Sequence, residues 1–179
     1  MLAEAIRREA ARLRTKYQTS DPYEICDALN IRVLQRPMGT QGRSCKGFFM
    51  THARCKVIVL NSDLPFFVRR IILAHELGHA CLHKSEAISA FHEFSYLDNS
   101  DRIEYEANIF AAEFLLQDSD VESVIELEYN IGQAASLLNV PPELLDFKLR
   151  YIPNEGNAVN APYFAHGDFL KRDISRPMN

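Results

Sequence analysis

The 179-residue sequence has no excess of basic residues, because 20 Lys and Arg stand against 24 Asp and Glu and give a formal net charge of −4. Such a chain has no general attraction for phosphate backbones or anionic lipid. It also lacks the apolar run of about 20 residues that spans a bilayer and the hydrophobic segment of a secretory signal. We therefore expect a soluble, cytoplasmic protein that binds neither membranes nor, directly, nucleic acid.

The four cysteines form no Cys-x-x-Cys pair, the spacing of zinc knuckles and redox motifs. They are Cys26, Cys45, Cys55 and Cys81. We expect reduced thiols, as in a cytosolic protein. A chain of this length buries roughly 70% of the surface that it exposes when unfolded, so it needs neither a disulfide nor a structural metal. Any metal that it binds is therefore expected to be functional.

Apolar spacing and turn residues predict an α+β fold, in which a short sheet packs on helices. Strands are expected over residues 31–34, 47–51 and 56–60. The last two form a hairpin, and its edge at residues 57–60 is where an extended peptide would add as a further strand. Helices are expected over residues 1–17, 22–29, 62–81, 99–114, 119 onward, 131–138 and 143–151. Ser119 and Glu122 have the spacing of a capping box.

The segment AHELGH at residues 74–79 carries the clearest chemical pattern. Histidines four apart on a helix are separated by about 6 Å of rise and about 40° of rotation, so His75 and His79 can reach one cation. Zinc accepts two neutral imidazoles and a carboxylate, and it leaves a fourth position for water. Glu76 follows the first ligand and is placed to take a proton from that water. We predict one zinc ion per chain.

The same pattern also arises by chance on exposed helices. Here its neighbours are apolar, Ile71, Ile72 and Leu73 before it and Leu82 after it, so unpaired His and Glu would be costly to bury. A metal site is therefore the better interpretation. His83 continues the four-residue series but is rotated about 80° from His75. We expect it to support a ligand or to line the cleft, with an ordinary surface histidine as the alternative.

The third ligand must come from another segment. Glu104 and Glu106 lie at the two edges of an apolar helical stripe, and the periodicity alone does not separate them. AHELGH at residues 74–79 and EANIFAA at residues 106–112 together resemble the ImmA/IrrE family of metallopeptidases. This resemblance extends over about residues 21–151. It implies that Glu106 is the third zinc ligand.

With this resemblance we expect three parts in the chain. Residues 1–117 form a small zincin-like catalytic domain, residues 118–151 form a helical hairpin that resembles a helix-turn-helix, and residues 152–179 form an irregular tail. Members of the family typically cleave a cognate helix-turn-helix repressor, so the resemblance implies a zinc-dependent endopeptidase with such a substrate. The alternatives are a zinc peptidase or toxin with another substrate, and a metal-binding module that sequesters a repressor without cleavage.

Two further predictions concern the substrate. Its oxyanion needs a donor besides the metal, and the candidates are His92, Tyr96 and Tyr105. Residues 118–146 contain seven acidic residues and no Lys or Arg, whereas a module that reads DNA needs a basic face. We therefore expect the helix-turn-helix-like segment either to pack on the catalytic domain or to receive a basic protein. The sequence leaves open the identity of the substrate, the physiological metal and the oligomeric state.

Overall fold

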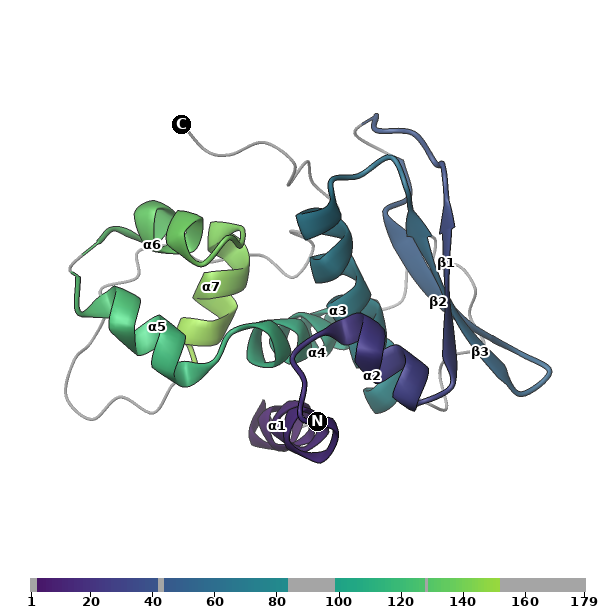
Figure 1. Ribbon diagram of the computed structural model, residues 1–179, viewed down its shortest axis with the longest axis horizontal. Coiled ribbons are helices and arrows are strands. Elements are labelled where there is room, and N and C mark those ends of the chain that lie inside the picture. The colour runs from purple at the N-terminus through teal and green to yellow at the C-terminus, as the bar shows by residue number, and fades with distance from the viewer. Residues whose placement is uncertain (1–2, 42–43, 84–98, 128, 152–179) are drawn as a thin grey trace.

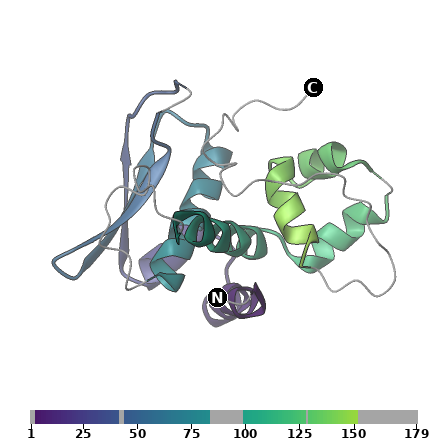
Figure 2. The same cartoon turned by 180° about the vertical axis from the view of Figure 1, so that it is seen from behind.

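A computed structural model of the protein describes residues 3–41, 44–83, 99–127 and 129–151 (Figure 1). These residues form seven helices and one three-stranded sheet, so the predicted α+β architecture is confirmed. The sheet lies on one side, α3 (Phe66–Leu82) and α4 (Asn99–Leu115) lie in the middle, and three short helices lie on the far side (Figure 1, Figure 2). Within the described part of the chain, no helix is long and apolar enough to cross a bilayer.

The sheet has the strand order β1 (Ile31–Arg36), β3 (Cys55–Asn61), β2 (Gly47–His52). β3 pairs antiparallel with β2, so the predicted hairpin is confirmed, and it pairs in parallel with β1. The prediction that residues 57–60 form a sheet edge is therefore wrong, because β3 is hydrogen-bonded on both sides. Among the described strands, the edges are β1 and β2.

Helix α3 approaches the sheet and α4 at glycines. A Cβ atom built on Gly47 of β2 would lie 2.6 Å from Cγ2 of Ile72, so the sheet meets α3 where a side chain does not fit. A Cβ atom built on Gly78 of α3 would lie 3.2 Å from Cβ of Phe110 on α4. Because Gly78 directly precedes His79, the close crossing of α3 and α4 brings α4 next to the motif histidines.

Two helices form the N-terminal part of the described chain, as predicted. Helix α1 (Ala3–Tyr17) is amphipathic and packs on α4. Its buried residues are Ile6, Ala10 and Leu13. Helix α2 (Pro22–Ala28) has Asp21 as its N-cap, whose carboxylate accepts a hydrogen bond of 2.9 Å from the backbone N–H of Tyr23. This bond satisfies one of the N–H groups that a helix leaves unpaired at its start.

Three short helices follow α4: α5 (Asp118–Ile125), α6 (Ile131–Leu137) and α7 (Pro142–Leu149). Helices α6 and α7 form the predicted helical hairpin. α7 packs on α4, where the ring centroids of Phe147 and Tyr105 lie 5.2 Å apart. Buried residues of all three helices belong to the same hydrophobic core as the sheet and α1. The domain boundary at residue 118 stays a prediction, and the predicted tail at residues 152–179 lies outside the described residues.

The capping box predicted at Ser119 and Glu122 is wrong. Helix α5 begins two residues earlier, with Gln117 at the N-cap position and no hydrogen bond from its side chain to the helix. A reciprocal capping box occurs instead at the start of α6. There the side chain of Asn130 accepts from the backbone of Gln133, and the side chain of Gln133 accepts from the backbone of Asn130.

A buried ion cluster joins the C-terminal helices to the rest of the fold. Lys148 of α7 is fully buried, and its Nζ lies 2.7 Å from Oε2 of Glu113 on α4 and also contacts Asp118 of α5. Nε of Arg7 on α1 lies 3.2 Å from Oε1 of Glu113. A buried charge without a partner is strongly destabilising, so this cluster favours one relative placement of the four helices.

Candidate metal centre

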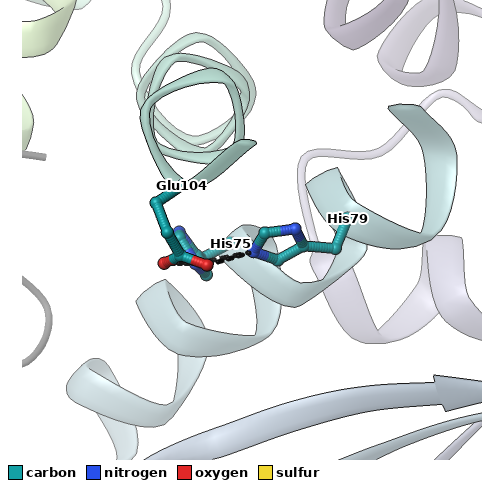
Figure 3. A group of neighbouring side chains, drawn as sticks. All are labelled: His75, His79 and Glu104. Carbon is teal, nitrogen blue, oxygen red and sulfur yellow. Dashed lines mark hydrogen bonds and ion pairs between the residues drawn. The ribbon is translucent and has the colours of Figure 1, made fainter. Parts of the chain in front are cut away.

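The two motif histidines lie side by side on α3 (Figure 3). His75 is 4% exposed and His79 is 5% exposed. Their Nε2 atoms lie 3.1 Å apart. The helix thus brings both imidazoles to one small space, as the four-residue spacing predicts. Ring nitrogens this close together suit the coordination of a shared cation.

Glu104 of α4 faces both histidines (Figure 3). Its Oε2 lies 3.4 Å from Nε2 of His75, and its Oε1 lies 3.4 Å from Nε2 of His79. One potential ligand atom from each residue lies within 4.8 Å of the other two. Among the described residues, no other group of three such side chains is arranged in this way. Two imidazoles and one carboxylate are a donor set of catalytic zinc sites, so the residues present fit zinc.

Asn108 fixes the orientation of the first histidine. It is fully buried on α4, and its side-chain oxygen lies 2.9 Å from Nδ1 of His75. Because an amide oxygen only accepts hydrogen bonds, Nδ1 of His75 carries the hydrogen. The lone pair of this imidazole is therefore on Nε2, the atom that faces Glu104 and His79. Partners of this kind orient the ligands in metalloproteins.

The electrostatics of the group also suit a metal. Burial lowers the pKa of His79 to about 4, so this imidazole is neutral near pH 7. Burial works to raise the pKa of Glu104, but the interactions with His75 and His79 together outweigh burial and hold this pKa well below its usual value. Burial works to lower the pKa of His75, but the interactions with Glu104, Glu76 and Asn108 together outweigh burial and raise this pKa. A carboxylate held ionised beside two imidazoles attracts a cation.

The structure does not bring Glu106 into this group. Its Oε2 lies 3.1 Å from Nε2 of His83, and its Oε1 lies 3.0 Å from Nε of Arg102. Residues two apart on a helix differ by about 200° in direction, so Glu104 and Glu106 leave α4 on different sides. The structure therefore groups Glu104, and not Glu106, with the two histidines, whereas the family resemblance implies Glu106 as the third ligand.

The sequence does contain a signal for Glu104 that the motif analysis missed. Asn108 follows Glu104 by four residues, so the two side chains share one face of α4. Asn108 meets His75, and the carboxylate on the same face must then point toward the histidines as well. Glu106 has no such relation to Asn108.

The other predicted site residues have different positions. Glu76 is buried on α3, directly after His75. The hydroxyl of Tyr105 lies 2.9 Å from that of Tyr151, so this oxyanion candidate takes part in the contact between α4 and the C-terminal segment. The other two candidates, His92 and Tyr96, lie outside the described residues. His83 is buried at the end of α3.

Comparison with known proteins relates this chain to peptidases. The family model described as IrrE N-terminal-like domain, of a peptidase family, matches residues 26–150, a range that contains both α3 and α4. An uncharacterized immunity region protein 2 of Bacillus phage phi105 is 37% identical over 143 residues, which cover 80% of this chain and 88% of that protein. Metallopeptidase ImmA of Bacillus subtilis strain 168 is 28% identical over 150 residues, which cover 79% of this chain and 82% of that protein.

Proposed function

We propose that this chain, which belongs to the peptidase family of the IrrE N-terminal-like domain, is a zinc-dependent endopeptidase with one zinc ion per chain. We assign His75, His79 and Glu104 as the metal ligands. The observation that carries the proposal is the convergence of these three side chains, whose ligand atoms lie within 4.8 Å of one another. Glu76, the residue after the first ligand, is the proposed general base.

The residues of the site divide the chemistry among them. When bound, zinc supplies a Lewis acid that lowers the pKa of water and polarises a peptide carbonyl. An oxygen of the Glu76 carboxylate accepts a proton from water as the water oxygen attacks the carbonyl carbon. The same carboxylate then gives this proton to the amide nitrogen as the C–N bond breaks. Glu76 is thereby ionised again, ready for the next cycle.

We further propose that the substrate is a basic helix-turn-helix repressor. The name of the phage relative, immunity region protein, supports a regulatory target. The segment of α5, α6 and the turn between them supports a basic partner, because it exposes both acidic and apolar side chains. We call these exposed side chains the acidic-apolar surface, and they are Asp120, Glu122, Glu126, Leu127, Tyr129 and Leu137.

Incubation with candidate helix-turn-helix repressors from the same genome tests the function and the surface together. Wild type is expected to cut the repressor at one site. The masses of the fragments, measured by mass spectrometry, identify this site. The triple variant Asp120→Lys, Glu122→Lys, Glu126→Lys is expected to cut about tenfold more slowly at low substrate concentration, because a few exposed ion pairs of about 0.5 kcal/mol each are lost. The rate for wild type should fall as salt rises, and that of the variant much less.

The control is Glu4→Lys, Glu24→Lys, Asp27→Lys, which reverses three exposed acidic residues on α1 and α2 and changes the net charge equally. An equal loss in both triple variants would contradict the docking role of the acidic-apolar surface. Binding of the repressor without any fragments would favour sequestration instead of cleavage. If another protein is cut and the repressor is not, the proposed peptidase function stands and the proposed substrate is wrong.

A further inference from the structure

A chain of polar contacts leads from the second ligand to α4. His83 is buried where α3 ends. Its Nδ1 lies 3.2 Å from Nδ1 of His79, and its Nε2 lies 3.1 Å from Oε2 of Glu106. The other oxygen of Glu106 accepts a hydrogen bond of 3.0 Å from Nε of Arg102. Both nitrogens of the His83 ring are therefore engaged, one by the proposed ligand and one by a carboxylate.

The carboxylate sets the direction of the hydrogen bonds for a neutral His83. An ionised carboxylate only accepts, so Nε2 of His83 must carry the hydrogen and donate it to Glu106. Nδ1 of His83 then has a lone pair and accepts. Its partner, Nδ1 of His79, must donate and so carries the hydrogen of that ring. The lone pair of His79 is left on Nε2, the nitrogen that faces His75 and Glu104.

We propose that His83 and Glu106 are positioning residues, which hold His79 in the tautomer that presents Nε2 to the metal. The inference rests on the proposed zinc site. It gives each ligand histidine an acceptor behind it, because Asn108 accepts from His75 in the same way. It also gives Glu106 a role that its distance from the ligand group otherwise leaves unexplained. Supporting contacts of this kind change metal affinity by about 10- to 100-fold when they are removed.

The first test measures the zinc Kd of purified full-length variants by competition with a chelator. His83→Phe, which fills the space without polar atoms, is expected to weaken binding by about 10- to 100-fold. His83→Asn places an amide oxygen near the former Nδ1 and should recover part of this loss. Glu106→Gln, which keeps size and loses the charge, should weaken binding by about tenfold. Glu24→Gln, the same change at an exposed position, should have no effect.

The second test reads the tautomer of His79 by nitrogen NMR of the histidine rings in metal-free protein that carries Glu104→Ala, because the carboxylate of Glu104 also faces Nε2 of His79 and would compete for the ring hydrogen. In this background the hydrogen should be on Nδ1, and the addition of His83→Phe should give a mixture of tautomers. A purely structural role would lower thermal stability and leave the hydrogen on Nδ1. If His83→Phe does not fold, Glu106→Gln decides by the same two measurements.

The outcomes separate this inference from the function on which it rests. If wild type binds no zinc, the proposed metal centre is wrong. If wild type binds zinc and both His83→Phe and Glu106→Gln bind it within about twofold of wild type, only the positioning role is overturned. A weakened Kd together with the mixed tautomer supports it.

Discussion

Replacement of Glu76 by Gln is expected to leave zinc bound and the fold intact while peptidase turnover falls by about 10²-fold or more, the usual size of a general-base contribution. The two side chains are nearly the same size, so a change in packing does not account for such a loss. An amide can still hydrogen-bond to water but does not accept its proton at neutral pH. The measurement is kcat for cleavage of the repressor, with zinc content determined on the same preparation.

The same variant separates an enzyme from a sequestering module. Glu76→Gln should still bind the repressor, because the acidic-apolar surface is unchanged and lies on other helices. Full relief of repression by Glu76→Gln in cells, without cleavage of the partner, would contradict the peptidase mechanism. Loss of zinc from the variant would instead show that Glu76 belongs to the ligand set.

Replacement of Glu104 by Ala is expected to weaken zinc binding by more than about 10²-fold, beyond the range for supporting contacts. The variant removes the only carboxylate among the three converging side chains. It leaves two buried histidines with a lower local attraction for a cation. Zinc Kd, again by chelator competition, is the measurement.

Glu106→Ala is the matched comparison, because it truncates the same residue type two positions along the same helix. Its loss of zinc affinity should be at least tenfold smaller than that of Glu104→Ala, because Glu106 is proposed to position His79 through His83 and not to bind the metal. A larger loss at Glu106 would restore the ligand assignment that the family resemblance implies. Thermal unfolding of both metal-free proteins controls for damage to α4.

The helix with the metal motif was predictable because its information is local. Four-residue spacing on one helix places His75 and His79 together regardless of the rest of the fold. The amphipathic α1 and the Asp21 cap of α2 were predictable for the same reason. Each rests on periodicity or on a hydrogen bond between residues two to four positions apart.

The proposed third ligand was not predictable in this way, because it depends on the rotation of α4 against α3. Glu104 and Glu106 each lie at an edge of the apolar stripe, and which edge faces the histidines depends on how α4 is rotated about its axis. The close approach of Gly78 to Phe110 fixes this crossing. The contact of Asn108 with His75 shows which face of α4 is turned toward the histidines.

The predictions of the sheet edge and of the start of α5 were wrong, because non-local contacts decide both features. The strand pattern identified the hairpin, but the position of β3 in the centre depends on its parallel pairing with β1. A nearly continuous apolar run such as residues 57–60 is typical of an inner strand that is buried on both faces of its sheet. The start of α5 is two residues earlier than its capping pattern suggests, where Asp118 joins the ion cluster of the buried Lys148.

Anomalous diffraction at the zinc absorption edge, from crystals of the zinc-loaded protein, tests the metal centre most directly. We expect one peak per chain, at about 2.0–2.2 Å from Nε2 of His75, from Nε2 of His79 and from a carboxylate oxygen of Glu104. Glu106 and His83 should lie outside bonding distance of this peak. A peak bonded to Glu106 and not to Glu104, or no peak between α3 and α4, would contradict the account.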